Sequence, residues 1–122
     1  RAYLYRDGSL ARLTRDHSYV QGLVDAGEIS EAEARVHSRR NVVTRAVGVD
    51  GEIEPECVWG QSMRGDVFLL CTDGLSGPFD DATISSMLGK GSELHVLSGA
   101  LIEESIEAGG DDNVTVLLVK LL

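Results

Sequence analysis

The sequence predicts one domain in which β-strands and α-helices are mixed. Three observations predict it: a tight hairpin signal near the N-terminus, helix starts that carry capping residues, and two short apolar runs typical of buried strands. The 122 residues have room for a single domain, and 43% of them are hydrophobic, as expected of a chain that forms a core. Eleven Lys and Arg against twenty Asp and Glu give a net charge of −9. This charge disfavours nucleic acid and bare anionic membrane as partners.

The first 40 residues predict a hairpin followed by two short helices. Alternating runs at 3–6 and 9–14 flank Asp7-Gly8, a strong signal for a tight β-turn. Ser18 begins a capping-box pattern, with Gln21 three positions later, and predicts a helix that ends before Gly27. A second box in the segment 30–33 predicts a helix through about residue 36.

The rest of the chain predicts four strands and two further helices. The β-branched run 41–47 and the weakly alternating run 53–59 predict two strands, separated by a turn at 49–52. The apolar runs 67–71 and 114–119 predict strands covered on both faces. Asp80 or Asp81 is expected to cap a helix that ends at Gly89, and Ser92 a longer one that ends before Gly109. The longer helix carries an apolar stripe made of Leu94, Leu97, Leu101 and Ala108.

Cysteine usage and hydropathy favour a cytoplasmic chain. Cys57 and Cys71 are fourteen positions apart and form no CxxC motif, which predicts reduced thiols. No apolar stretch approaches the roughly 20 residues of a membrane-spanning helix, so we expect no membrane contact from this segment. Arg1 leads directly into a strand-like run, and we therefore expect the chain to be a fragment.

Two aspartates adjoin the predicted buried strands. Asp73 directly follows the strand 67–71, and Asp112 directly precedes the strand 114–119. If these strands pair antiparallel, the two carboxylates lie at the same sheet edge, where they repel each other unless a cation lies between them. Oxygen ligands suit Mg²⁺ and Mn²⁺, so a hydrolytic metal site is one interpretation. A turn at Asp73 and a local cap at Asp112 explain the same residues without a metal.

Other polar groups leave similar alternatives open. Gly109-Gly110 permits close approach of the backbone to a ligand, and a helix stop explains it equally well. His17 and His37 could titrate near neutral pH or be purely structural. Three arginines could meet a phosphate or pair with neighbouring carboxylates: Arg39, Arg40 and Arg45. Cys71 is the weakest candidate nucleophile, because an apolar strand raises a thiol pKa and denies access.

Five segments in one order resemble a known family along essentially the whole chain. They resemble the C-terminal half of the bacterial metal-dependent serine/threonine protein phosphatases of the PPM type, also called type 2C. The most specific segments are the strand followed by Asp-Gly-Leu-Ser at 67–76 and the Gly-Gly-Asp-Asp-Asn-Val-Thr run at 109–115. The others are RAYLY at 1–5, LTRDHS at 13–18 and RNVVTRAVG at 40–48.

The resemblance implies an α+β fold of four layers, in which two antiparallel sheets pack face to face between outer helices. It implies that Asp73 and Asp112 bind metal in a centre of two, or with a third site three, Mn²⁺ or Mg²⁺ ions. Residues 18–40 match the family's flap, which bears on substrate choice, and Arg39, Arg40 and Asn41 lie at its return. Relatives commonly carry His-Pro where this chain has His37-Ser38.

The resemblance also implies an activity that this segment lacks on its own. The family hydrolyses phosphoserine and phosphothreonine in proteins with a metal-activated water, so that phosphorylated proteins, including serine/threonine kinases and their substrates, are the expected partners. The N-terminal half supplies the phosphate-binding arginine and further metal ligands, and these motifs are absent here, so we expect no catalytic residue besides the metal ligands and an inactive fragment. The alternative is a non-catalytic, phosphatase-like binding module.

Overall fold

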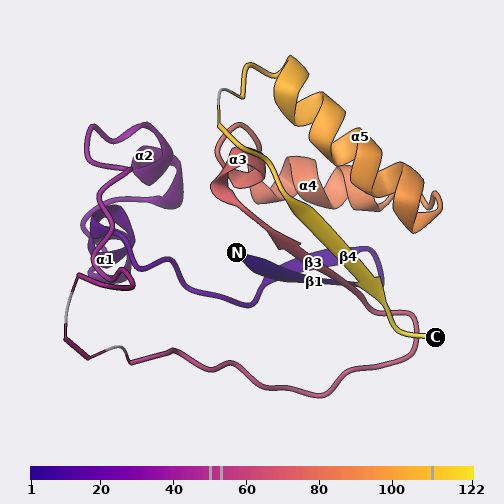
Figure 1. Ribbon diagram of the computed structural model, residues 1–122, viewed down its shortest axis with the longest axis horizontal. Coiled ribbons are helices and arrows are strands. Elements are labelled where there is room, and N and C mark those ends of the chain that lie inside the picture. The colour runs from indigo at the N-terminus through magenta and orange to yellow at the C-terminus, as the bar shows by residue number, and fades with distance from the viewer. Residues whose placement is uncertain (50, 53, 111) are drawn as a thin grey trace. The chain divides into compact units, whose positions relative to one another are not determined.

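The computed structural model describes residues 1–49, 51–52, 54–110 and 112–122 (Figure 1). The chain divides into two compact units, one formed by 1–14 with 59–122 and the other by 15–58. Asp50, Ile53 and Asp111 lie outside the described residues.

The first unit begins with the predicted hairpin. Strand β1, Ala2–Arg6, pairs antiparallel with strand β2, Ser9–Arg12. Asp7 and Gly8 connect them with φ angles of 49° and 80°, the left-handed backbone that a tight hairpin turn requires. The hairpin is confirmed, although β2 ends two residues earlier than the sequence pattern predicts.

A four-stranded antiparallel sheet forms the centre of this unit. Its strand order is β2-β1-β3-β4, where β3 is Val67–Cys71 and β4 is Val116–Lys120. Cys71 lies opposite Val116 in the β3–β4 register, so the end of β3 meets the start of β4. The antiparallel pairing is confirmed, and β4 is displaced by up to two residues from the predicted run 114–119.

Three helices and one face of the sheet share the core. They are α3, Asp73–Ser76, which the sequence pattern did not predict, α4, Asp81–Leu88, and α5, Leu94–Glu107. Asp80 caps α4 as expected, because its carboxylate accepts from the Thr83 amide at 2.8 Å. The fully or almost fully buried core comprises Tyr3, Leu69, Leu75, Ile84, Met87, Leu88 and Leu101.

Two details of α5 differ from the prediction. Glu93 rather than Ser92 occupies the N-cap position, without a side-chain hydrogen bond. The buried stripe continues from Leu101 to Ser105, whereas Ala108 is exposed at the C-cap. A spacing of four residues keeps Ser105 on the face of Leu101, so the helix geometry and not polarity decides which side chain is buried.

The other face of the sheet carries apolar side chains that are open to solvent. Leu70, Leu117 and Val119 are 44%, 54% and 41% exposed, respectively. Neighbouring residues of a strand point to opposite faces, and Leu69, next to Leu70, is fully buried. The prediction that both strands are covered on both faces is therefore wrong for the described residues, since helices from this unit pack on one face only.

The second unit contains the predicted helical pair, α1, Tyr19–Asp25, and α2, Glu31–Val36. The Ser18 hydroxyl accepts from the Gln21 amide at 3.2 Å. Ser30 and Glu33 form a complete capping box, in which the Ser30 hydroxyl accepts from the Glu33 amide and the Glu33 carboxylate accepts from the Ser30 amide.

The strands predicted at 41–47 and 53–59 are wrong for the residues that the structure describes. In the first run a single bridge joins Ser18 and Val43, and residues 54–59 of the second are irregular. Val43 and Val47 are 63% and 85% exposed. β-Branched residues favour a strand only when a neighbouring strand gives them a surface to pack on, and none pairs with these runs over the described chain. The predicted turn and the second strand each include an undescribed residue, Asp50 and Ile53.

The α+β class is confirmed, with an antiparallel sheet and a helical layer. The described residues form one such sheet of the implied four-layer arrangement. Both cysteines are free thiols, Cys57 exposed and Cys71 half-buried. Among the described helices, none has the length and apolar character needed to cross a membrane.

Candidate metal site

Asp73 is held by the junction between β3 and α3. The strand ends at Cys71, Thr72 takes the extended N-cap position, and Asp73 is the first residue of the helix. The Asp73 side chain is exposed, and its backbone carbonyl accepts from the Gly77 amide at 2.6 Å. The change from strand to helix therefore fixes the backbone of Asp73 and leaves its carboxylate at the surface.

Asp112 lies in the segment that leads into β4 and meets the same junction. One of its carboxylate oxygens accepts from the Asn113 amide at 2.7 Å, a local bond of the kind that the sequence allows for. The side chain is exposed. The second carboxylate oxygen has no hydrogen bond to the described residues, and neither Asp112 nor Asp73 forms an ion pair with a described basic residue.

Thr72 joins the two segments. Its hydroxyl donates to the Asn113 carbonyl at 3.1 Å and accepts from the Thr115 amide at 2.9 Å, while its own amide donates to the Thr115 carbonyl at 3.2 Å. These bonds extend the β3–β4 pairing beyond Cys71 and Val116. The residues next to Asp73 and Asp112 are thereby brought together at one end of the sheet. The bridging role of Thr72 carries no local sequence signal.

Gly74 makes the approach of the two segments unusually close. A Cβ atom at this position would lie 2.4 Å from the Asn113 carbonyl oxygen and 3.0 Å from the Val114 Cα. Both contacts involve backbone atoms, which cannot rotate away as a flexible side chain could. Only glycine therefore fits between the first turn of α3 and the chain that leads into β4.

The donor chemistry fits a hard divalent cation in part. Two exposed carboxylates at one sheet end are the oxygen ligands that Mg²⁺ and Mn²⁺ prefer, and Mg²⁺ commonly takes one or two protein carboxylates with waters completing its shell. Within the described residues, no cluster of three or more His, Cys, Asp or Glu side chains has a metal-binding arrangement. The described chain thus supplies two carboxylates and no larger ligand set.

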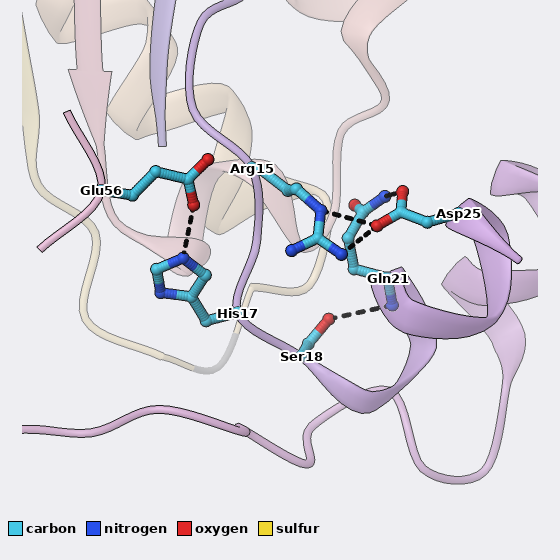
Figure 2. A network of polar contacts seen from close by, with 6 residues as sticks. All are labelled: Arg15, His17, Ser18, Gln21, Asp25 and Glu56. Atoms are coloured by element: carbon cyan, nitrogen blue, oxygen red, sulfur yellow. Dashed lines mark hydrogen bonds and ion pairs between the residues drawn. The ribbon is translucent and has the colours of Figure 1, made fainter. Parts of the chain in front are cut away.

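A polar network in the second unit ties the segment before α1 to two other parts of that unit (Figure 2). Arg15 pairs with Asp25 at the end of α1, with a distance of 2.6 Å from Nε to Oδ2. His17 Nε2 lies 2.8 Å from Glu56 Oε2, and the hydrogen bond to His17 is the main reason why the pKa of Glu56 is lowered. Glu56 is therefore a structural partner of His17, which favours a structural role for this histidine over titration near neutral pH.

The three candidate flap residues lie on the exposed return that follows α2. The guanidinium carbon of Arg39 lies 4.7 Å from the ring centroid of Tyr19, a cation–π distance. The backbone amide of Arg39 donates to His37 Nδ1 at 3.0 Å. Arg40 and Asn41 have exposed side chains. Neither Arg39 nor Arg40 forms an ion pair with another described residue.

A small recess of about 90 Å³ lies at the opposite end of β3, lined by Arg6, Asp7 and 63–66. Asp66 is 1% exposed, and Arg6 donates to both of its carboxylate oxygens at 2.6 Å. These bonds to Arg6, with a third from the Met63 amide, lower the pKa of Asp66 to about 2. The paired charges anchor the start of β3 against the hairpin, which is a structural role.

The chain is similar in sequence to bacterial serine/threonine phosphatases. It is 41% identical over its whole length to the serine/threonine protein phosphatase PstP of Mycobacterium tuberculosis, of which it covers 23%. It is 37% identical over 98% of its length to the serine/threonine phosphatase stp of Listeria monocytogenes, of which it covers 48%. The chain thus spans half or less of the length of these curated relatives. No family model matches it.

The fold matches solved phosphatases equally well. The crystal structure of PstP from Mycobacterium tuberculosis superimposes with a TM-score of 0.91 at 42% identity, over 99% of this chain and 51% of that one. A structure of the PstP catalytic domain in complex with two manganese ions gives a TM-score of 0.86 at 40% identity, over 98% and 49% of the two chains. The predicted resemblance is therefore confirmed in both sequence and fold. The chain is a homologue of the bacterial PPM-type serine/threonine phosphatases and corresponds to a segment about half as long as the solved phosphatase structures that it matches.

Proposed function

We propose that this chain is the C-terminal part of a metal-dependent protein serine/threonine phosphatase, in which Asp73 and Asp112 bind Mn²⁺ or Mg²⁺. The observation that carries the proposal is the convergence of the two carboxylate-bearing segments through the Thr72 hydrogen bonds. The homologous PstP domain in complex with two manganese ions supports the choice of metal.

The two aspartates act as ligands and not as nucleophiles. Pairs of divalent ions, when bound, activate a water and offset charge on a transferred phosphoryl group. This chain's own contribution is to hold two carboxylates at one sheet end, with Gly74 and Thr72 fixing the backbone that bears them. The substrates are phosphoserine and phosphothreonine residues of cytoplasmic proteins. These proteins include serine/threonine kinases and the substrates of those kinases.

The return after α2 contacts the substrate protein. We assign residues 18–40, which lie within the unit 15–58, to a flap, with Arg39, Arg40 and Asn41 at its edge. Stacking on Tyr19 restricts the Arg39 guanidinium, and among the described residues no carboxylate pairs with it. An arginine in this condition is available for the phosphate or carboxylate groups of a phosphoprotein.

The isolated segment is expected to be inactive. Two carboxylates are too few to hold a dinuclear centre, because each ion needs about six ligands and waters alone do not fix their positions. Leu70, Leu117 and Val119 are also partly exposed on one face of the sheet, and apolar side chains gathered on one face favour an interface. A non-catalytic, phosphatase-like binding module is the second candidate, and the same exposed face favours it.

Hydrolysis of a phosphothreonine peptide by the full-length protein, with and without Mn²⁺, tests the proposal. We expect Mn²⁺-dependent activity that Asp73→Asn and Asp112→Asn each reduce by at least two orders of magnitude. Asp7→Asn is the matched control, since Asp7 is an exposed turn residue far along the chain from both and asparagine tolerates its positive φ. Activity that survives both substitutions contradicts the assignment, and no activity in the parent protein favours the binding module.

A further inference from the structure

Ser105 is a buried hydroxyl at the C-terminal end of the otherwise apolar stripe of α5. It lies on α5, is 1% exposed, and its Oγ donates to the Gly74 carbonyl oxygen at 2.7 Å. Burying a hydroxyl is unfavourable unless it forms a hydrogen bond, so the partner of Ser105 explains why a polar residue is tolerated here. That partner is the residue directly after Asp73.

The Gly74 carbonyl needs this donor because of Pro78. In an α-helix the carbonyl of residue 74 would accept from the amide of residue 78, but proline has no amide hydrogen. The Gly74 carbonyl therefore lacks the amide donor that residue 78 would supply in a continuous α-helix. The Ser105 hydroxyl supplies the missing donor from another helix.

The same residue also contacts the segment that leads to Asp112. The Ser105 carbonyl accepts from the Gly110 amide at 3.1 Å. A Cβ atom on Gly110 would lie 2.7 Å from this carbonyl oxygen and 3.3 Å from the Ser105 Oγ. Ser105 therefore contacts Gly74, which directly follows Asp73, and Gly110, which lies two residues before Asp112.

We propose that Ser105 is a positioning residue of the metal site, which sets the separation of the Asp73 and Asp112 carboxylates. This inference rests on the proposed function, in which these two aspartates bind the metal. The hydroxyl fixes the first turn of α3, and the carbonyl fixes the end of α5 where the chain turns towards β4. Ser105 itself touches neither metal nor substrate.

The test is the Mn²⁺ affinity of the full-length protein, measured by electron paramagnetic resonance without substrate. Removing a group that supports a metal ligand commonly weakens affinity 10- to 100-fold, and Ser105 acts one residue away from a ligand. We therefore expect Ser105→Ala to weaken Mn²⁺ binding about tenfold, which corresponds to about 1.4 kcal/mol. Ser98→Ala is the matched control, because Ser98 lies on the same helix and donates only to the nearby His95 carbonyl.

A second substitution separates positioning from a general loss of stability. Pro78→Ala restores an amide that can donate to the Gly74 carbonyl. We expect Ser105→Ala to cost clearly less Mn²⁺ affinity in the Pro78→Ala background than in the parent protein. If Ser105 has a purely structural role, Ser105→Ala lowers the melting temperature, and its Mn²⁺ affinity does not recover in the Pro78→Ala background.

The outcomes that overturn the inference also distinguish it from the proposed function. If Asp73→Asn loses Mn²⁺ while Ser105→Ala binds within twofold of the parent, Ser105 has no positioning role and the metal site stands. If Asp73→Asn binds like the parent, the metal assignment itself fails. Should Ser105→Ala not fold, Gly110→Ala provides the same test, since its Cβ would displace the Ser105 carbonyl, and an unchanged Mn²⁺ affinity there also refutes the inference.

Discussion

Substitution of Gly74 by alanine is expected to separate the two carboxylate-bearing segments. The added Cβ would lie 2.4 Å from the Asn113 carbonyl oxygen, whereas ordinary contact begins at 3.4 Å, so the chain before β4 must withdraw by about 1 Å. Overpacking of this kind commonly costs about 1–3 kcal/mol. Alanine also favours the helical conformation by about 0.5–1 kcal/mol over glycine, which offsets only part of that cost.

Thermal unfolding and Mn²⁺ titration of the full-length protein measure the two consequences. We expect Gly74→Ala to lower the melting temperature by several degrees and to weaken Mn²⁺ binding. Gly99→Ala is the matched control. Gly99 lies inside α5, and a Cβ added there would have no atom within 4 Å apart from its chain neighbours and the backbone of its own helix, so alanine should stabilise the protein slightly. A Gly74→Ala protein with the parent's stability and Mn²⁺ affinity would show that the close approach has no energetic importance.

Substitutions at three further positions test the framework of the first unit. Arg6 holds the pKa of Asp66 at about 2, against 3.8 for the unperturbed group. The stabilising contribution of the Asp66 carboxylate is therefore complete above about pH 4 and is lost as the pH falls towards about 2. Asp66→Asn should flatten this part of the acid unfolding curve. Burial raises the pKa of Tyr3 from 10.0 to about 12, so stability is expected to fall as the pH rises from 10 to 12, and Tyr3→Phe should remove that fall, as followed by circular dichroism. Asp80→Ala should cost about 1 kcal/mol in denaturant unfolding, because it removes the α4 cap on Thr83, whereas Asp80→Asn should cost little.

Local chemistry made much of the fold predictable. The Asp7-Gly8 turn, the serine caps at 18 and 30, and the Asp80 cap each act over three or four residues, so their signal lies within a short window of sequence. The valine runs failed as predictors for the opposite reason. Val43 and Val47 form a strand only if another strand lies beside them, and sequence propensity does not record that partner.

The site was predictable in part. Antiparallel pairing of two apolar runs was enough to bring the neighbourhoods of Asp73 and Asp112 to one sheet end, and Thr72 confirms that meeting through its hydrogen bonds to the second segment. The contacts that set the spacing were not predictable, because they join residues distant in sequence. Ser105 and Gly74 are 31 positions apart, and the only sequence signals are a serine on an apolar stripe and the proline at position 78.

The metal assignment is tested most directly by diffraction from crystals of the full-length protein grown with Mn²⁺ and measured at the manganese absorption edge. The metal assignment predicts an anomalous peak at about 2.0–2.3 Å from one oxygen of the Asp73 carboxylate and one oxygen of the Asp112 carboxylate. It also predicts that Asp73→Asn diminishes this peak. Manganese bound elsewhere in the protein, with both carboxylates free of metal, would contradict the account.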